Sequence, residues 1–251
     1  MKKLLGFSIF LVFVLIASLT AEAKVTLPAI FSDNMVLQQN TQVNVWGKAA
    51  PGEKVTVKAS WLDKAVTAKA AANGKWTVKL KTPKAITNQS VTVSGENEIT
   101  INNVLIGEVW LCTGQSNMEF PVSRHPDVKW NTGMLNEAEE LKDADYPEIR
   151  LFHVKHQLAH EGELDDCEGE WLVCNPKNLY DFSAVGFVFG RKLYKELKMP
   201  VGLIQSTWGG THAESWTKLD VMKKNPLYAD VLKDFALEGE GGYRLVWHDE
   251  F

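Results

Sequence analysis

The sequence predicts an antiparallel β-sandwich that is followed by an α/β domain with a parallel sheet. Two observations lead to this prediction. Between about residues 25 and 104, apolar and polar side chains alternate with a period of two, which is typical of strands with one buried face. Beyond residue 105, strand patterns alternate with helical patterns. Strands that are joined through helices run parallel, because the crossover returns the chain to the end of the sheet where it started.

Turn residues divide the N-terminal alternation into short runs. Asn73-Gly74 stands between two of these runs and favours a hairpin, because both residues tolerate the left-handed backbone of a tight turn. No grouping of catalytic residue types is visible in this segment. The apolar positions that we expect on the buried face are Val43, Val45, Val55, Val57, Trp76, Val78, Leu80, Val91, Val93, Ile99 and Ile101.

The α/β pattern begins with a strand at residues 109–113, which Gly114 ends. A helical stretch over residues 134–142 follows, and then strands at 149–154 and 201–207. Ligands of open α/β sheets bind at the carboxyl ends of the strands, so a site is expected just after residues 113 and 207. Between the last two strands, spacings of three and four predict an amphipathic helix that buries Phe182, Val185, Phe189, Leu193 and Leu197.

The N-terminus has the pattern of a secretory signal peptide. Lys2 and Lys3 precede an apolar run to about residue 19, and Ala21-Glu22-Ala23 forms a small-residue cleavage site before Lys24. We therefore expect residues 1–23 to be removed and the mature protein to be periplasmic or extracellular, without stable insertion into a membrane. The alternative is a membrane anchor, although a spanning helix needs about 20 apolar residues.

Composition excludes some classes of partner and site. The formal charge of −4, from 27 basic and 31 acidic residues, leaves no basic excess for a nucleic acid. The three cysteines fit no zinc spacing, so we predict no metal site and no cofactor. Export permits a disulfide between Cys167 and Cys174, and two free thiols are the alternative. Cys112 stands in an apolar strand pattern and should be buried. The oligomeric state is not predicted.

Two motifs follow the predicted strand ends. In the first, Ser116 follows Gly114 at a strand-to-helix turn, where a hydroxyl can project and free backbone N–H groups can stabilise an oxyanion. The alternative is that Ser116 or Asn117 caps a helix. The second motif, residues 208–216 (WGGTHAESW), has paired glycines that expose backbone N–H groups and two tryptophans that could stack on a sugar. Its alternative is a glycine turn flanked by core aromatics.

Four blocks of the sequence follow one another in a specific order. They are residues 27–38 (LPAIFSDNMVLQ), 109–119 (VWLCTGQSNME), 182–186 (FSAVG) and 201–204 (VGLI), the last leading to 208–211 (WGGT). Together these blocks resemble the sialate O-acetylesterase family, over about residues 24–219. The resemblance implies a β-sandwich at 24–104, then an SGNH-hydrolase-like α/β domain at 105–237. It also implies hydrolysis of O-acetyl esters on sialic acid or related glycans, with an acetylated carbohydrate as substrate.

The resemblance assigns roles to individual residues. Ser116 matches the nucleophile, and its own backbone N–H should contribute to the oxyanion hole. Gly209 and Gly210 match a block that lines the active site. Many SGNH enzymes add an asparagine side chain as an oxyanion donor, and this segment has none, so the second and third donors stay open. The motif positions that imply supporting contacts around the substrate are Gln115, Asn117 and Glu214.

The sequence departs from the family at the catalytic base. The family's histidine lies well downstream of the nucleophile, with an aspartate a few residues before it. Because a serine hydroxyl is a poor nucleophile without a base, we expect the His–Asp pair beyond Phe251 and little activity from this chain alone. His212, near the second motif, is not favoured as the base. No histidine stands in an Asp-x-x-His run; the six are His125, His153, His156, His160, His212 and His248.

The C-terminal residues suggest a larger protein. Residues 238–242 (EGEGG) are typical of a linker, and residues 243–251 (YRLVWHDEF) resemble the first strand of laminarinase-like glycoside hydrolases, with an unrelated strand as the alternative. Asp249 and Glu250 do not match the catalytic carboxylates of those enzymes. Two other functions stay open: a non-catalytic carbohydrate-binding or truncated module of a polysaccharide-degrading protein, and a lipase-like hydrolase. The latter is disfavoured because no long apolar segment lies near Ser116.

Overall fold

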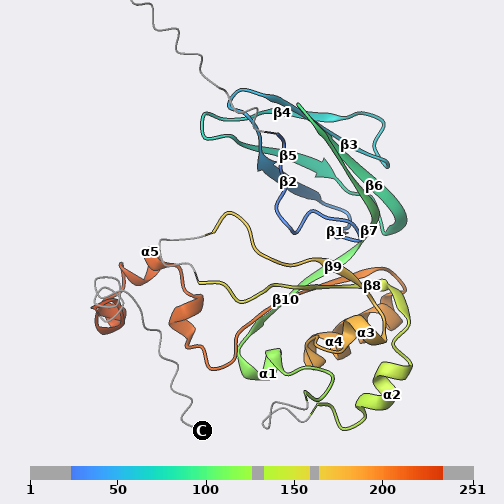
Figure 1. Ribbon diagram of the computed structural model, residues 1–251, viewed down its shortest axis with the longest axis vertical. Coiled ribbons are helices and arrows are strands. Elements are labelled where there is room, and N and C mark those ends of the chain that lie inside the picture. Colours follow the sequence, from blue (N-terminus) through green and yellow to red (C-terminus); the bar gives the residue numbers. More distant parts are fainter. Residues whose placement is uncertain (1–23, 126–132, 159–163, 234–251) are drawn as a thin grey trace, which may run out of the picture.

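The computed structural model describes residues 24–125, 133–158 and 164–233 (Figure 1). The predicted signal peptide, the linker at 238–242, and the laminarinase-like residues 243–251 lie outside these ranges. Within them, no helix is both long and apolar enough to cross a membrane. Figure 1 shows a group of N-terminal strands above a second layer, in which the helices α1 to α4 gather on one side of the strands.

The N-terminal strands form two antiparallel arrangements around a shared core. β2 and β5 pair as a two-stranded sheet, while β3 pairs with β4 and with β6. In β5 the burial alternates strictly, with Trp76, Val78 and Leu80 inside, as the two-residue period predicts. The strands are β1 (Val36–Gln38), β2 (Gln42–Lys48), β3 (Lys54–Ala59), β4 (Val66–Lys69), β5 (Lys75–Lys81) and β6 (Ile86–Ser94).

The hairpin expected at Asn73-Gly74 is wrong. The tight turn forms, with Gly74 at φ +76° and the Ala71 N–H donating to the Lys75 carbonyl at 2.9 Å. The flanking strands nevertheless have different partners, because β4 pairs with β3 and β5 pairs with β2. A turn is fixed by local backbone geometry, whereas strand pairing depends on which apolar face each strand buries.

Strand β7 (Glu98–Gly114) joins the N-terminal strands to the α/β part. It is 17 residues long, and the predicted boundary between residues 104 and 105 falls within it. Its first half pairs with β6 and its second half pairs in parallel with β10 (Val201–Thr207). The result is one eight-stranded sheet in the order β4-β3-β6-β7-β10-β8-β9, with β1 beside β7. A closed sandwich of the N-terminal strands stays a prediction, because the larger sheet continues into the α/β part.

The sheet of the α/β part is mixed rather than wholly parallel. β8 (Tyr146–His153) runs parallel to β10, as expected, but β9 (Trp171–Cys174) pairs with β8 in the antiparallel direction. The helical stretch expected over residues 134–142 is shorter in the structure. The helices are α1 (Ser116–Glu119), α2 (Glu137–Lys142), α3 (Pro176–Leu179), α4 (Ala184–Leu197) and α5 (Leu219–Met222).

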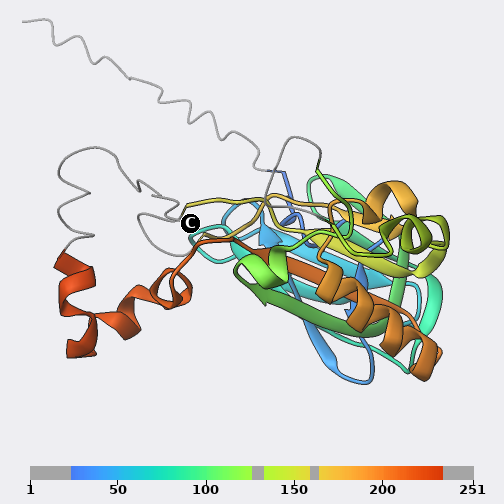
Figure 2. The same ribbon diagram turned by 90° about the horizontal axis from the view of Figure 1, so that it is seen from below.

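Helix α4 forms as predicted, and its buried face is the predicted one only in part, since Phe182 just before the helix is buried and Leu193 packs against the core. Val185, Phe189 and Leu197 are 50%, 39% and 44% exposed. The helix instead buries Phe187 and small residues such as Gly190, where an added Cβ would overlap the Leu203 side chain. Close packing on the sheet therefore selects the small residues, which a count of large apolar side chains overlooks. Figure 2 shows α4 running along the sheet.

The three cysteines are free thiols. Cys112 is buried, as predicted. Cys167 packs against the core of the N-terminal strands, whereas Cys174 is buried in the core beneath α4. Burial raises the pKa of the Cys174 thiol to about 12, so this group stays a neutral, apolar-like part of the core. The structure thus has two free thiols rather than a bridge between residues 167 and 174.

A buried arginine joins the two parts of the molecule. Arg150 lies on β8 and is 3% exposed, and its guanidinium donates to the side chains of Asn34 (3.2 Å) and Asn103 (3.3 Å). Trp171 on β9 donates from Nε1 to the Ile30 carbonyl at 2.9 Å. Burial lowers the pKa of Arg150, because the charged form loses hydration. These contacts fix the N-terminal loops onto β8 and β9.

We expect Gly107→Ala to destabilise the protein by about 1–3 kcal/mol, because overpacking forces backbone shifts. Gly107 lies in the middle of β7, and an added Cβ would overlap the Pro200 carbonyl group that precedes β10. Urea titration gives the free energy of unfolding. Asn102→Ala is the control, since Asn102 is exposed in the same strand. Equal stability of the two variants would contradict the close approach of residues 107 and 200.

Candidate active site

Ser116 lies at the turn between β7 and α1, as the sequence predicts. Its side chain is exposed, and its hydroxyl donates to Gln115 Oε1 at 3.3 Å, the only hydrogen bond of this hydroxyl among the described residues. The helix-cap alternative is wrong. Gln115 is the N-cap residue, and no side chain accepts a capping hydrogen bond there. Ser116 is therefore free to react rather than engaged in holding the helix.

The first turn of α1 leaves two backbone donors free. The amides of Met118 and Glu119 donate to the Gln115 carbonyl, at 2.9 and 3.0 Å. Within the described part of the chain, the amides of Ser116 and Asn117 have no acceptor. Unsatisfied N–H groups at the start of a helix carry a partial positive charge. They can receive a developing negative charge next to the serine hydroxyl.

The second motif lies against the first because β7 and β10 are neighbours. Their parallel register ends with Ser206 beside Thr113 and Thr207 beside Gly114. The Trp208 amide then donates to the Gly114 carbonyl at 3.1 Å. A Cβ added to Gly209 would lie 3.6 Å from Ser116 Cα and 3.8 Å from Ser116 Cβ. These are ordinary contact distances, so the loop lies directly beside the serine; the close contact of such a Cβ would be with Glu119 Oε2, at 2.7 Å.

The backbone N–H of Gly209 is already occupied. It donates to the Oε2 atom of Glu119, the last residue of α1. In this conformation the amide holds a carboxylate and is not free for an oxyanion. Gly210, with φ at +76°, supplies the left-handed turn that carries the loop away from β10. The second motif therefore contributes the shape of its backbone to the site, whereas the free backbone N–H donors come from the start of α1.

Glu119 also connects the loop to His156, a histidine to which the sequence analysis assigned no role. His156 Nε2 lies 2.8 Å from Glu119 Oε1 and 2.9 Å from the Thr207 carbonyl oxygen. Its ring stacks on Trp208, with centroids 4.2 Å apart and planes 5° apart. One face of Trp208 is therefore covered by imidazole and is not open to a sugar. The signal that could have found this contact is the position of His156 just after β8, the neighbour of β10.

A pocket of about 590 Å³ adjoins the Glu119–His156 contact. His153 at the end of β8 lines it, and the pKa of this residue is lowered, first by burial and then by nearby His156. Glu119 and Asp181 oppose that shift because they favour the charged imidazole. The pocket thus has both acidic and basic side chains. Its lining residues are Glu119, His153, Lys155, His156, Gly169, Glu170 and Leu172.

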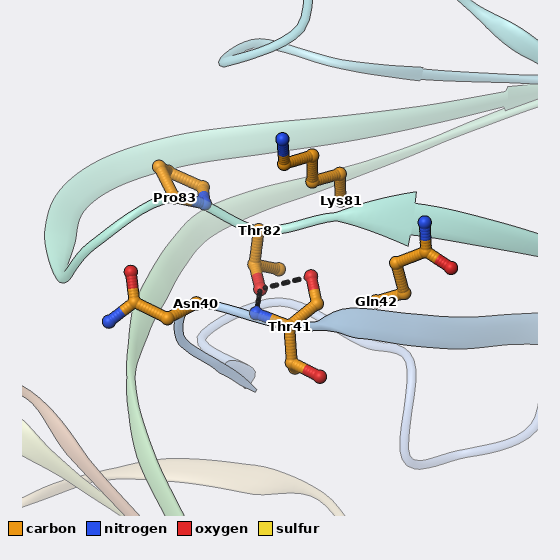
Figure 3. Close-up of a pocket in the computed structure, with 6 residues that line it drawn as sticks. All are labelled: Asn40, Thr41, Gln42, Lys81, Thr82 and Pro83. Atoms are coloured by element: carbon orange, nitrogen blue, oxygen red, sulfur yellow. Dashed lines mark hydrogen bonds between the residues drawn. The ribbon is translucent and has the colours of Figure 1, made fainter.

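A second pocket, of about 390 Å³, lies at one end of the two-stranded sheet (Figure 3). The Thr82 hydroxyl there accepts from the Thr41 amide at 3.1 Å and donates to the Gln38 carbonyl at 2.7 Å. These bonds close the loops that connect the strands. Lys81 is the one ionisable side chain in its lining, and we assign the pocket no catalytic role. It is lined by Asn40, Thr41, Gln42, Lys81, Thr82 and Pro83.

The remaining candidates are less closely connected to Ser116. Asn117 is exposed within α1. Glu214 and His212 lie at the 3-10 helix Ala213–Trp216, and within the described ranges no hydrogen bond or ion pair joins either side chain to Ser116. In the same ranges, no three His, Cys, Asp or Glu side chains are grouped as metal ligands. The structure thus brings together Gln115, Ser116 and Gly209, and adds Glu119 and His156.

Comparison with known proteins shows the family. A family model described as a carbohydrate esterase, sialic acid-specific acetylesterase, matches residues 106–248, more than half of the chain. The chain belongs to this family. The matched segment contains both loops of the site.

Curated relatives and a solved structure agree with this membership. Sialate O-acetylesterase from Mus musculus is 33% identical over 215 residues, which are 78% of this chain and 38% of the relative. The Homo sapiens protein of that name is 31% identical over 205 residues, which are 74% of this chain and 37% of that protein. A crystal structure of a carbohydrate acetylesterase from Xanthomonas citri matches with a TM-score of 0.70 and 31% identity, over 80% of this chain and 44% of that one. The chain thus spans less than half the length of these relatives.

We expect Glu119→Ala to loosen the second loop, because the Gly209 amide and His156 lose their shared acceptor. The free energy of unfolding should fall by about 1–3 kcal/mol, and the Gly209 amide should exchange with deuterium at least about tenfold faster. Urea titration and amide-exchange NMR measure the two effects. Glu139→Ala, on the exposed side of α2, is the matched control. Unchanged exchange at Gly209 would show that the carboxylate does not hold this loop.

We expect His153 to make stability depend on pH. Because its pKa is lowered in the folded protein, the unfolded chain binds the proton more readily. Stability should therefore fall as the pH drops through the unfolded value of about 6.5, until the lowered folded pKa is passed. His153→Asn should flatten this dependence in urea titrations at several pH values. The control variant His212→Asn, at an exposed histidine, should not flatten the dependence of stability on pH. The same slope in the His153 variant and the parent would refute the assignment.

Proposed function

We propose that this chain provides the nucleophile and oxyanion donors of a serine esterase that removes O-acetyl groups from sialic acid or related glycans. The observation that carries the proposal is the exposed Ser116 hydroxyl beside the free amides of Ser116 and Asn117. Family membership gives the reaction class, since the matching family model describes a carbohydrate esterase. Acetyl transfer needs a nucleophile next to donors for the oxyanion, and these groups meet that need.

In the proposed reaction, the Ser116 oxygen attacks the acetyl carbonyl carbon. The carbonyl oxygen becomes an oxyanion, which the Ser116 and Asn117 amides stabilise. The serine proton passes to a histidine base and from there to the departing sugar oxygen, leaving an acetyl-serine. Water then attacks with the help of the same base and releases acetate. We propose that the histidine and its aspartate come from sequence beyond Phe251, because no described histidine is hydrogen-bonded to Ser116.

The substrate proposal rests on the relatives and on the shape of the loop. The mouse and human relatives are named sialate O-acetylesterases, and the Xanthomonas citri relative is a carbohydrate acetylesterase. The loop at Gly209 lies beside Ser116, and Trp216, 43% exposed, offers an aromatic face to a sugar ring. Gln115, next to the hydroxyl, and Glu214 are proposed to contact the substrate. Gly210 is proposed to shape the loop that receives it.

The other proposals concern the whole protein. We propose that the mature protein begins near Lys24 and acts in the periplasm or outside the cell, on the pattern of residues 1–23. We propose a β-sandwich at residues 24–104 and an SGNH-like domain at residues 105–237, on the basis of the family resemblance. A second candidate function is a non-catalytic carbohydrate-binding module. The absence of a histidine hydrogen bond to Ser116 within the described residues favours it.

Ser116→Ala tests the nucleophile. In a longer form that includes the family's His–Asp pair, the variant should lose at least about 10³-fold in kcat/KM, because the acyl-enzyme cannot form. Acetate release from O-acetylated sialic acid and hydrolysis of 4-nitrophenyl acetate measure it. Ser215→Ala, at an exposed serine of the neighbouring loop, is the matched control. Retention of full activity by the Ser116 variant would exclude this nucleophile.

The mature chain alone separates the two candidate functions. We expect slow hydrolysis of 4-nitrophenyl acetate, within about tenfold of the Ser116→Ala variant, because the base is proposed to come from sequence beyond Phe251. Rapid turnover by the isolated chain would place the base within it. Binding of a glycan without turnover, in both the short and the longer form, would favour the binding module.

A further inference from the structure

The two parts of the molecule carry opposite charges. Residues 24–104 contain ten lysines, no arginine and five acidic residues, whereas residues 105–251 contain 15 basic and 25 acidic residues. The formal charge of −4 for the whole chain therefore conceals a basic N-terminal part. Such an asymmetry between two parts of one chain indicates an anionic partner for the basic part. Where the lysines lie in the fold determines which anion they suit.

Four of these lysines gather on the outer face of the two-stranded sheet. In β5 the odd-numbered residues from 75 to 81 are exposed, because the even-numbered ones form the buried side of the strand. The exposed residues of β2 lie directly opposite them in the antiparallel register. We call this surface the basic face. It consists of the cross-strand pairs Lys48 with Lys75, Trp46 with Thr77, Asn44 with Lys79, and Gln42 with Lys81.

One end of the basic face already holds a carboxylate. Lys75 Nζ lies 2.5 Å from Asp165 Oδ1, and Lys48 Nζ lies 3.4 Å from Asp165 Oδ2. The hydrogen bond from Lys75, followed by that from Lys48, lowers the pKa of Asp165, because both favour the ionised carboxylate. Side chains that face each other across this sheet thus fit a carboxylate between them.

The other end has similar groups without an acidic partner. Among the described residues, the side chains of Lys79 and Lys81 form no hydrogen bond or ion pair. The same holds for Asn44 and Gln42, which lie opposite them. Directly opposed residues have Cβ atoms about 5 Å apart, so each ammonium group has an amide beside it. Such a pair can bind a carboxylate and a neighbouring hydroxyl together. Figure 3 shows Gln42 and Lys81 beside the pocket at this end.

An exposed tryptophan stands between the two ends. Trp46 is 40% exposed, and its ring packs edge-on against buried Phe31, with centroids 4.6 Å apart. This contact fixes the indole before any ligand arrives, which reduces the entropy lost on binding. Thr77, opposite Trp46, has Lys75 and Lys79 on either side of it on the same face. The face therefore combines an aromatic surface with cations and amides, the groups that suit a sugar ring bearing an acid.

We propose that the basic face binds a glycan chain that carries carboxylate groups, with Trp46 against a sugar ring and with Lys79 and Lys81 paired to the carboxylates. Residues 24–104 have no arginine, the residue best suited to phosphate groups, which disfavours a nucleic acid. Exposed ion pairs are weak one by one, so a polymer that engages several at once should bind more tightly than a single sugar. The proposal rests on the surface of the N-terminal strands and not on the proposed esterase reaction.

Binding of acidic polymers by the mature chain is the first test. Affinity electrophoresis and calorimetry with polygalacturonate and with polysialic acid distinguish a hexuronic acid from a sialic acid as the source of the carboxylate. We expect at least one of them to bind, and the affinity to fall at least about tenfold between low and high salt, because salt screens exposed charges. Neutral dextran should bind more weakly than that polymer. Binding of neither acidic polymer, or equal binding of dextran, overturns the proposal.

Charge reversal locates the binding. The double variant Lys79→Glu, Lys81→Glu should lower the affinity for the polymer at least about tenfold. The matched control is Lys54→Glu, Lys58→Glu, which makes the same charge change at exposed residues of β3, in the other sheet. Equal losses in the two double variants would show that only the net charge matters, and would overturn the proposal.

Trp46→Ala tests the aromatic contact. It should also weaken polymer binding at least about tenfold, because a sugar ring loses its stacking surface. Urea titration shows whether the variant, which loses its contact with Phe31, is folded. Unchanged affinity in a folded variant would overturn the part assigned to Trp46. If the variant does not fold, Trp46→Phe, which keeps a smaller ring there, should bind more weakly than the parent, and equal binding would contradict the stacking.

Other anions and Ser116→Ala complete the test. Double-stranded DNA and vesicles that contain phosphatidylserine should bind more weakly than the acidic glycan, and equal or tighter binding of either would overturn the proposal. Ser116→Ala should leave polymer binding unchanged, because the serine lies on α1 and outside the basic face. Weaker binding by this variant would place the polymer at the candidate active site instead. Unchanged hydrolysis by the variant would remove the nucleophile and leave the basic face in place.

Discussion

The parallel pairing of β7 with β10 is the interaction on which the site depends. It places Thr207 beside Gly114, so that two loops about 90 residues apart in the sequence leave the sheet at the same point. A Cβ added to Gly209 would then lie 3.6 Å from Ser116 Cα, and the Glu119 carboxylate accepts a hydrogen bond from the Gly209 amide. A slip of one residue in this register would turn alternate side chains to the other face and separate the two loops. The geometry of the candidate site is thus a consequence of strand register more than of either loop alone.

Glu119 adds an electrostatic connection to this backbone arrangement. The carboxylate is shared between an amide of the second loop and the imidazole of His156, and the imidazole lies flat on Trp208. Three segments therefore meet at one acidic group: the end of α1, the residues after β8 and the residues after β10. Charge-assisted hydrogen bonds of this kind are stronger than neutral ones. The Glu119 carboxylate is therefore suited to hold the loop after β10 in a fixed position relative to Ser116.

The sequence predicted those features that depend on local chemistry. Ser116 was expected at a strand-to-helix turn because Gly114 follows an apolar run, and the period of two located the buried side of β5. Features that depend on distant partners were not predicted. The continuity of β7 could not be read from residues 98–114, since nothing local shows that two different neighbours share one strand. The buried face of α4 was predicted only in part, because packing against Leu203 requires a glycine, and the Glu119–His156 contact joins residues from separate elements.

Strand β7 also determines how the molecule can move. Domains that swing toward each other usually do so about a short flexible connection. Here the connection is a 17-residue strand that is hydrogen-bonded along both halves, and Arg150 and Trp171 hold the segment before β1 through Asn34 and Ile30. Such a joint resists bending, so the N-terminal strands cannot fold down over Ser116 as a lid. The N-terminal strands thus keep a constant distance and orientation relative to Ser116.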